Sequence, residues 1–198
     1  MRVLILTIAM VLSSMQALAA ETPLKGKKVA VLCTMGVEKI ELVAPVEALR
    51  AAGAVVHVVS PDGKPVRVLE WPEWAGELPV DKSLAQVKPA DYDALYVPGG
   101  SMSPDLLILS PEALAFIAAF EKSHKPIASM CHGPAALIAA GVVKGKEVTA
   151  WPSLKINLQN AGAVWKDQEV VVSHNLITSR NPKDIPSLTR TMIKVWAR

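Results

Sequence analysis

Short apolar runs of strand length alternate with longer segments of helix length along this chain, and this alternation constrains the fold more than any other feature. Lys28 is followed by the run Val-Ala-Val-Leu-Cys, and a periodic segment at 40–52 then ends at Gly53. A β-branched run at 54–59 stops at the turn sequence Ser-Pro-Asp-Gly of residues 60–63. Strand–helix–strand units of this kind place parallel strands in one sheet with helices against it. The sequence therefore predicts an α/β fold.

The same rhythm returns in the second half of the chain. Residues 64–90 interrupt it, because Trp and Pro break any period there, and we interpret them as an excursion at the sheet edge with a strand or hairpin arm at 65–69. The later predicted elements are strands at 92–97, 126–130, 147–150, 169–173 and 176–178, of which the last two are paired, and helices at 111–122, 134–140, 153–160 and 184–196.

Length and composition favour one domain and argue against nucleic acid as a partner. The chain has 198 residues, is 51% hydrophobic and contains no internal repeat or linker, so one core can form. Its 21 Lys and Arg and 18 Asp and Glu are interspersed and give a net charge of +3. Without a basic block, there is little support for nucleic-acid binding.

The first twenty residues have the pattern of a secretory signal. Arg2 gives a positive start, residues 3–12 are apolar, and Ala17-Leu18-Ala19 is a small-x-small cleavage sequence. A membrane-spanning helix would need about 20 apolar residues, and Ser13 interrupts this stretch earlier. We therefore predict a signal peptide at 1–20, a mature domain at 21–198 with no membrane anchor, and a periplasmic or secreted protein.

Export would expose two cysteines to an oxidising compartment. Cys33 lies in an apolar strand pattern and Cys131 at a strand-to-helix turn, and nothing in the sequence brings their Cα atoms within the roughly 7 Å that a disulfide needs. We predict that the two do not pair.

Three loops are candidates for a functional site, because ligands of open parallel sheets bind outside the carboxyl ends of the strands. These loops are residues 34–41, 98–103 and 130–134. The third places Cys131 before a helix that starts near Pro134, where positive potential would lower the pKa of the thiol and backbone N–H groups could receive an oxyanion. The alternative is a buried, unreactive cysteine.

The other two loops supply groups that such a nucleophile needs. Gly99 and Gly100 allow a substrate to approach the backbone, as an oxyanion hole requires, although Gly-Gly alone is also typical of a plain turn. Glu38 and Glu41 stand at the start of a helix, where they either serve the site or only compensate the helix dipole.

Together these segments resemble the ThiJ/PfpI superfamily, which includes PfpI-type intracellular peptidases, the parkinsonism-associated deglycase and glyoxalase III-like enzymes. The resemblance covers about residues 27–197. Its motifs here are Gly-Val-Glu-Lys-Ile-Glu-Leu at 36–42, Asp-Tyr-Asp-Ala-Leu-Tyr-Val-Pro-Gly-Gly at 91–100, Ala-Ser-Met-Cys-His-Gly-Pro at 128–134 and Ser-Arg-Asn-Pro at 179–182.

The resemblance implies a flavodoxin-like three-layer sandwich and a homodimer or higher homo-oligomer. It implies Cys131 as the nucleophile, Glu41 as the carboxyl group hydrogen-bonded to it, and the N–H groups of Gly100 and His132 as the oxyanion hole. In the PfpI branch an acidic residue of a neighbouring subunit completes a triad with the histidine, and we match Asp91 to it. Residues 71–79 depart from the hairpin that is usual in the family.

The remaining candidate residues are assigned by their chemistry. We expect Gly99, Glu38 and Arg180 to contact substrate; for Arg180 a surface or subunit contact is the alternative. The other histidines, His57, His124 and His174, lack a second ligand at zinc-like spacing, so we predict no metal site. The sequence has neither a dinucleotide-binding glycine pattern nor a phosphate loop, so we expect no cofactor.

These residues favour an enzyme whose cysteine attacks a small carbonyl compound or a peptide. A glyoxalase or deglycase reaction needs little more than Cys131 and Glu41, whereas amide hydrolysis also needs His132 as an acid. The alternative is a redox-sensing or chaperone-like stress protein that uses an oxidisable Cys131. A glutamine-amidotransferase-like domain is a weaker alternative.

Overall fold

A seven-stranded sheet forms the centre of the structure, a computed structural model that describes residues 22–198. Its strands are β1 (Lys28–Leu32), β3 (Val55–Ser60), β6 (Lys82–Ser83), β7 (Ala94–Val97), β8 (Ile127–Met130), β11 (Val170–Ser173) and β12 (Leu176–Ser179). They lie in the order β11-β12-β8-β7-β1-β3-β6. All neighbours pair in parallel except β11, which is antiparallel to β12, so the predicted mostly parallel sheet is confirmed.

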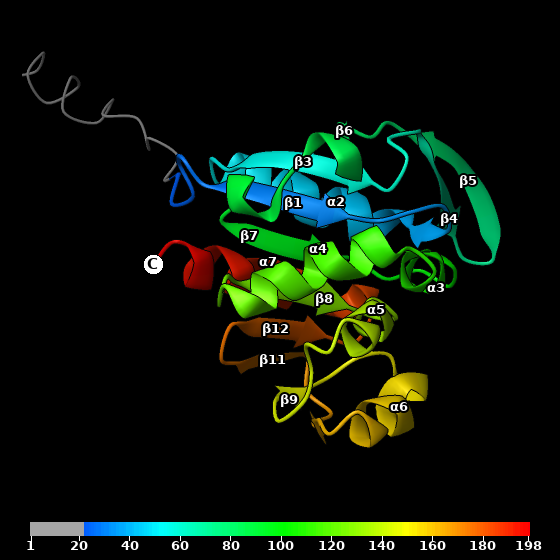
Figure 1. The fold of residues 1–198 in the computed structure, drawn as a ribbon, viewed down its shortest axis with the longest axis vertical. Coiled ribbons are helices and arrows are strands. Elements are labelled where there is room, and N and C mark those ends of the chain that lie inside the picture. Colours follow the sequence, from blue (N-terminus) through cyan, green and yellow to red (C-terminus); the bar gives the residue numbers. More distant parts are fainter. Residues whose placement is uncertain (1–21) are drawn as a thin grey trace, which may run out of the picture.

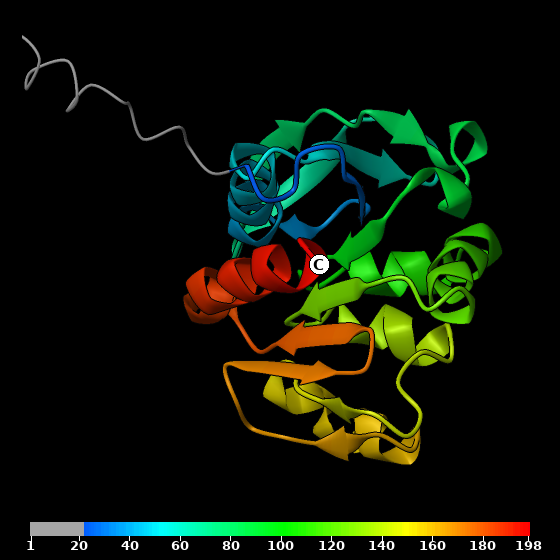
Figure 2. The ribbon, with the colours of Figure 1, turned by 90° about the vertical axis from the view of Figure 1, so that its left-hand side faces the viewer.

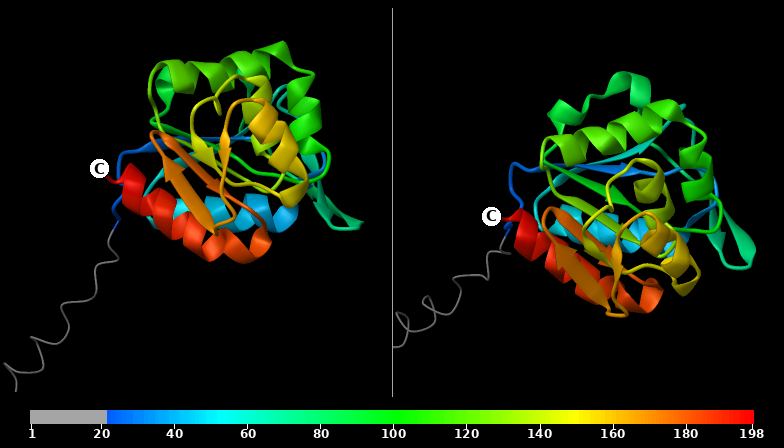
Figure 3. Two further views of the ribbon diagram at one scale, coloured as in Figure 1. Left: turned by 90° about the horizontal axis from the view of Figure 1, so that it is seen from below. Right: turned by 60° about the horizontal axis from the view of Figure 1, so that its bottom comes forward.

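Helices cover both faces of this sheet and make the three layers that the resemblance implies (Figures 1 and 2). The α-helices are α2 (Lys39–Ala51), α3 (Ser103–Ile108), α4 (Pro111–Lys122), α5 (Pro134–Ala139), α6 (Lys155–Asn160) and α7 (Ile185–Trp196). Short 3₁₀ helices are η1 (Leu84–Gln86), η2 (Pro89–Asp91), η3 (Pro152–Leu154) and η4 (Pro182–Asp184). Seen from below in Figure 3, α2 and α7 lie on one side of the sheet and α4 on the other.

The two faces of the sheet bury two separate hydrophobic clusters. Along β1, Val29 and Val31 belong to the cluster under α2 and α7, whereas Ala30 and Leu32 belong to the cluster under α4 and α5. Because successive side chains of a strand point to opposite faces, a strand covered on both sides must be apolar throughout. This is why the central strands appear in the sequence as continuous apolar runs.

Residues 64–90 include a hairpin that stands at the end of the sheet where the parallel strands finish (Figure 1). Strands β4 (Val66–Glu70) and β5 (Glu73–Leu78) pair antiparallel, and β2 (Val37–Glu38) adds to β4 in parallel. The predicted arm at 65–69 is confirmed, but the expected departure from a hairpin at 71–79 is wrong. The residues that interrupt the pattern, Trp71 and Pro72, occupy the turn between the two strands.

Two further details differ from the sequence prediction. Helix α3 was not predicted, because six residues are too few to show a helical period. The predicted strand at 147–150 shortens to β9 (Glu147–Val148), which pairs with β10 (Val164–Trp165) in a separate two-stranded sheet.

The predicted signal peptide at 1–20 lies outside the described residues. Within residues 22–198, no helix has both the length and the apolar character that crossing a membrane would require.

Candidate active site

Cys131 lies in the turn between β8 and α5, with a backbone φ of 55°. A residue with a Cβ adopts this left-handed conformation at a cost, and such turns are typical of nucleophiles held at the end of a strand. The Cys131 N–H donates to the carbonyl of Ser179 at 3.1 Å, and its carbonyl accepts from the Trp151 N–H at 2.9 Å. The neighbouring strand and the loop before η3 therefore hold the predicted turn in place.

The turn opens into a cavity of about 690 Å³ at the carboxyl end of the sheet. The three loops predicted to form the site all contribute to it, together with the end of β4, the β4–β5 turn, Trp151 before η3 and the first residue of η4. The lining residues are Glu38, Ile40, Glu41, Glu70, Trp71, Gly100, Ser101, Cys131, His132, Trp151 and Pro182.

Glu41 reaches this cavity from the first turn of α2, and its backbone carbonyl is bonded to the sheet. Pro45 lies inside α2 and lacks the N–H that would bond to the carbonyl of Glu41 one turn earlier. The Tyr96 hydroxyl of β7 donates to that carbonyl instead, at 2.7 Å in the buried interior. A hydrogen bond between the sheet and the helix thus takes the place of a bond within the helix.

The Glu41 carboxyl is fully buried and faces the thiol of Cys131. Its Oε2 accepts from the Gly99 N–H at 3.0 Å, whereas Oε1 has no hydrogen-bond partner among the described residues. Burial raises the pKa of Glu41 to about 7, against the hydrogen bonds from Cys131 and Gly99, which lower it. Near neutral pH this carboxyl can therefore both hold and release a proton beside the thiol.

The Cys131 thiol differs from the prediction in its acidity. Burial and the negative charge of Glu41 raise the pKa of Cys131, although the N–H groups of Gly100 and His132 lower it. The prediction that the pKa of the Cys131 thiol is lowered is therefore wrong. Desolvation of the thiol and the nearby Glu41 carboxylate raise this pKa by more than the two N–H groups lower it. Of the two groups, Glu41 is therefore the one that loses its proton first, because its pKa is raised only to about 7.

Gly99 and Gly100 supply the space and the donors that an oxyanion hole needs. A Cβ on Gly99 would lie within 2.8 Å of Glu41 Oε2, Cys131 Cβ and His132 N. Gly100 has a φ of 95°, and a Cβ there would collide with the backbone around Gly36. No side chain fits at either position, and the N–H groups of Gly100 and His132 both point at the sulfur. The two predicted donors thus converge on Cys131.

His132 stands beside the thiol and is held by an aromatic ring. Its Nδ1 lies 3.3 Å from Cys131 Sγ, and its imidazole stacks on Trp151 with ring centroids 5.6 Å apart. Burial lowers the pKa of His132, and the charge of Asp105 on α3 raises it. Within residues 22–198, the acidic charge that acts on the pKa of His132 therefore comes from Asp105.

Asp91 lies elsewhere. It ends η2 before β7, whereas the site lies after β7, and its carboxylate accepts from the Lys88 N–H at 2.9 Å. A contact of Asp91 with His132 would have to come from another subunit, and that role stays a prediction.

The predicted substrate-binding residues separate into two groups. Gly99 and Glu38 belong to the site: Glu38 lines the cavity, and its Oε2 accepts from the Trp71 N–H at 3.4 Å. Arg180 instead makes ion pairs with Asp184 at 2.9 Å and Asp167 at 2.8 Å. Its guanidinium is occupied by these two carboxylates of the same chain, and its contact with substrate stays a prediction.

The other candidate residues are placed away from this chemistry. Cys33 is fully buried directly after β1, burial raises its pKa to about 12, and both cysteines are free, as predicted. His57 contacts the hydroxyl of Tyr92 at 3.0 Å. Among residues 22–198, no group of three or more His, Cys, Asp or Glu side chains is arranged to hold a metal ion.

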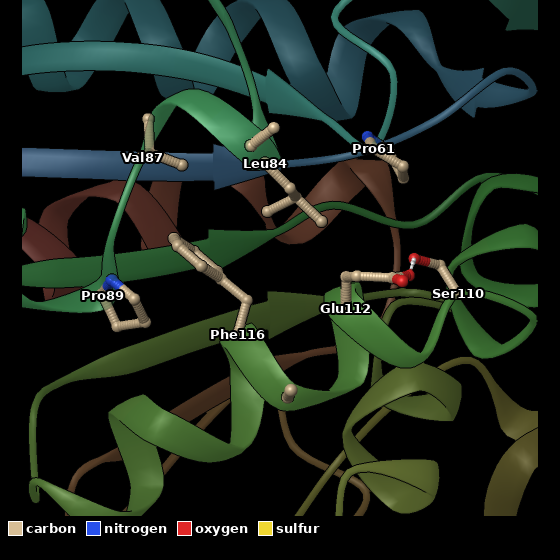
Figure 4. Close-up of a pocket in the computed structure, with 9 residues that line it drawn as sticks. Pro61, Leu84, Val87, Pro89, Ser110, Glu112 and Phe116 are labelled. Carbon is tan, nitrogen blue, oxygen red and sulfur yellow. Dashed lines mark hydrogen bonds between the residues drawn. The ribbon is translucent and has the colours of Figure 1, made fainter.

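A second cavity, of about 470 Å³, lies between η1 and α4 (Figure 4). Its walls are mostly apolar, with Leu84, Val87 and Phe116 prominent. Its one charged lining residue within the described part of the chain, Glu112, accepts from the Ser110 hydroxyl at 3.1 Å, at the start of α4. Because this lining holds no thiol or imidazole from residues 22–198, the cavity at Cys131 is the candidate active site.

Five residues of the site were not singled out by sequence reasoning, and one of them, Glu70, lies at the end of a hairpin strand that was predicted only in outline. Trp71 and Trp151 gave no signal, because their position at the cavity depends on turns whose direction the sequence does not show. Ser101 and Asp105 could have been found, since Pro104 and Asp105 are typical of a first helical turn and closely follow Gly100.

Comparisons with known proteins agree with this arrangement. The sequence profile of the DJ-1/PfpI family matches residues 27–195. The chain is 41% identical over 171 residues to "Putative cysteine protease YraA" of Bacillus subtilis, covering 86% of this chain and 98% of the relative. It is 39% identical over 172 residues to "Protein/nucleic acid deglycase 2" of Escherichia coli, covering 86% and 98%.

The fold comparison points the same way. The crystal structure of Drosophila melanogaster DJ-1beta superposes with a TM-score of 0.79 at 30% identity, covering 86% of this chain and 90% of the other. The three-layer, flavodoxin-like sandwich is therefore the fold of relatives as well as of this chain. With Cys131 at the strand-to-helix turn and a profile match over almost the whole described region, the chain belongs to the DJ-1/PfpI family.

Proposed function

We propose that this protein is a cysteine-dependent enzyme that acts on reactive carbonyl compounds or their adducts, in the manner of a glyoxalase or deglycase. One observation carries the proposal: the Cys131 thiol faces a buried Glu41 carboxyl with a pKa of about 7, and two backbone N–H groups point at the same sulfur. The relatives named as deglycases support this choice of reaction.

The first step is the addition of the thiol to an aldehyde. As Sγ forms a bond to the carbonyl carbon, the thiol proton passes to the Glu41 carboxylate, and the carbonyl oxygen becomes an oxyanion between the N–H groups of Gly100 and His132. Glu41 then returns this proton to the oxyanion, which gives a neutral hemithioacetal. A carboxyl with a pKa near 7 is suited to both transfers.

A 2-oxoaldehyde can react further at the same two residues. Glu41 carries the proton from C1 to C2 of the hemithioacetal, and the proton of the C1 hydroxyl passes to the oxygen on C2, so that the product is the thioester of a 2-hydroxy acid. Water then cleaves the thioester, releases the acid and restores the thiol. No group beyond substrate, water and the residues of this site is consumed.

Hydrolysis of peptide bonds is the second candidate function, favoured by the 3.3 Å contact of His132 with the sulfur and by a relative that carries a cysteine protease name. His132 would donate a proton to the leaving amine. Replacing the acidic residues one at a time tests this: Asp105→Asn should impair peptide hydrolysis if the charge within the chain supports His132, and Asp91→Asn if a partner subunit supplies it.

Redox sensing is the competing interpretation, and turnover separates it from an enzyme. An enzyme consumes many equivalents of aldehyde per Cys131, whereas a sensor reacts once. The deciding experiment measures methylglyoxal consumption by residues 21–198 without added thiol, beside Cys131→Ala and Glu41→Gln. Multiple turnovers that disappear in Cys131→Ala support the proposal. An inactive wild type whose Cys131 still titrates with alkylating reagents would refute it.

Export and assembly are parts of this proposal that depend on the sequence and the family resemblance alone. We expect a mature chain that begins at residue 21 in the periplasm or medium, and a homodimer or larger homo-oligomer. Mass spectrometry of the fractionated protein checks the first expectation, and light scattering checks the second.

A further inference from the structure

The cavity at Cys131 has an unusual balance of charge. Its lining contains three carboxyl groups, those of Glu38, Glu41 and Glu70, and no lysine or arginine side chain lines it among residues 22–198. Its one imidazole within this range, His132, has a pKa lowered by burial and is neutral at pH 7. The walls around the nucleophile therefore carry negative charge only.

The nearby cations do not cancel this charge. Lys39 pairs with Glu70 at 2.7 Å and neutralises one carboxylate at the rim. Arg180 is occupied by two aspartates and is not in the lining. Among the described residues, Glu38 accepts only the long 3.4 Å bond from the Trp71 N–H, and Glu41 Oε1 is buried without a partner. Neither Glu38 nor the Glu41–Cys131 pair forms an ion pair with a lysine or arginine side chain among the described residues, and the pair is stabilised only by backbone N–H groups.

Two tryptophans stand at the same opening. The Trp71 side chain follows Glu70 at the β4–β5 turn and is 72% exposed, and Trp151 is 40% exposed although its ring stacks on His132. An exposed indole beside an uncompensated carboxylate is a favourable environment for an organic cation, because the ring face and the carboxylate attract the same charge.

We propose that this acidic and aromatic rim, formed by Glu38, Glu70, Trp71 and Trp151, is a subsite for the positively charged part of the substrate. The enzyme would then prefer carbonyl compounds or adducts that carry an ammonium or guanidinium group near the reacting carbon, and disfavour those that carry a carboxylate, sulfonate or phosphate there. The inference rests on the proposed function for its meaning, but the charge preference can be measured without turnover.

The net charge of the protein would not produce a preference for cationic substrates. The net charge of the chain is +3, so long-range attraction favours anions, and a preference for cations has to come from the local field of the cavity. This contrast makes the sign of the effect informative.

Charge-matched thiol reagents test the subsite directly. Cys131 is labelled with 2-(trimethylammonio)ethyl and with 2-sulfonatoethyl methanethiosulfonate; each reaction forms a mixed disulfide at Sγ and releases methanesulfinate. The ratio of the two rates is compared with the ratio for 2-mercaptoethanol. Cys131→Ala reports any labelling of the buried Cys33. We expect a cation preference about tenfold above that of the free thiol, which weakens as salt is added.

Variants assign the effect to the rim. Glu38→Gln should reduce the rate ratio about threefold or more, because it removes an unpaired carboxylate, and Glu70→Gln should also reduce it, because it leaves the charge of Lys39 unpaired at the rim. Glu77→Gln makes the same change of charge on β5, away from the cavity lining, and should leave the ratio unchanged. A wild-type ratio equal to that of 2-mercaptoethanol, or a Glu77→Gln effect as large as that of Glu38→Gln, would overturn the subsite.

A turnover measurement separates this inference from the proposed function. Phenylglyoxals with a para trimethylammonium or a para sulfonate group are compared by kcat/KM. Turnover of both at equal rates, with no charge preference in labelling, would overturn the subsite and leave the carbonyl enzyme intact. Absence of turnover, with the labelling preference present, would refute the enzyme and leave a cation-selective thiol site.

Discussion

The hydrogen bond from Tyr96 to the backbone of Glu41 predicts a measurable coupling with Pro45. In Tyr96→Phe the buried Glu41 carbonyl loses its donor, because Pro45 has no N–H to replace the lost hydroxyl. An unpartnered buried carbonyl costs about 1–3 kcal/mol. For a domain of this size, a loss of about 2 kcal/mol lowers the melting temperature by about 4–8 °C.

The double mutant identifies the cause. In Pro45→Ala the helix regains an N–H one turn after Glu41, which can bond to the same carbonyl. Tyr96→Phe should then cost about 1 kcal/mol less in the Pro45→Ala background than in the wild type, a coupling measured by urea unfolding of all four proteins. Equal costs in the two backgrounds, within about 0.5 kcal/mol, would refute the idea that the sheet supplies the bond missing from the helix.

Three further predictions concern the ionisation of the site, its ion pairs and its space. Because the pKa of Glu41 is raised to about 7 in the folded protein from 4.5, its contribution to stability is full below pH 4.5 and is lost as the pH rises through 7. The loss is about 3 kcal/mol, and chemical denaturation across this range should show it in the wild type and not in Glu41→Gln. Arg180→Gln leaves the buried Asp184 without its partner and should cost about 2 kcal/mol of stability, while kcat/KM with methylglyoxal changes less than about twofold; a larger kinetic loss would return Arg180 to the substrate site. Gly99→Ala places a Cβ against the Glu41 carboxylate and Cys131, so we expect at least about a hundredfold loss of kcat/KM in a protein that still folds by circular dichroism, and near-normal activity would contradict the geometry of the site.

The fold and the main chemical groups could be predicted from the sequence because both depend on local patterns. Apolar runs marked the strands to within one or two residues at their ends, and the helix predicted at 111–122 has the same bounds in the structure. The loops after three strands had to meet at one edge of the sheet, so the order of the elements was enough to bring Cys131, Glu41 and Gly100 together.

What could not be predicted depends on packing between distant segments. The Tyr96 hydroxyl is 55 residues from Glu41 in the chain, and no local pattern links them. The predicted shift of the Cys131 pKa had the wrong direction. The sequence shows that Cys131 precedes a helix, which lowers a thiol pKa, but it does not show that the thiol is buried and lies close to a carboxylate, which raise it.

The order of the strands has a consequence for folding kinetics. Neighbours in the middle of the sheet, β1 and β7, are far apart in the chain, with Val29 beside Ala94, and β12 joins β8 from near the end of the sequence. Contacts between such distant segments form slowly, because the intervening chain must be closed into a loop first. The turn at Cys131 depends on the last of these pairings, through its bond to Ser179. A partly folded chain would therefore lack the strained turn that sets the Cys131 thiol against Glu41 and the oxyanion-hole donors, and this arrangement would be complete only when the sheet is complete.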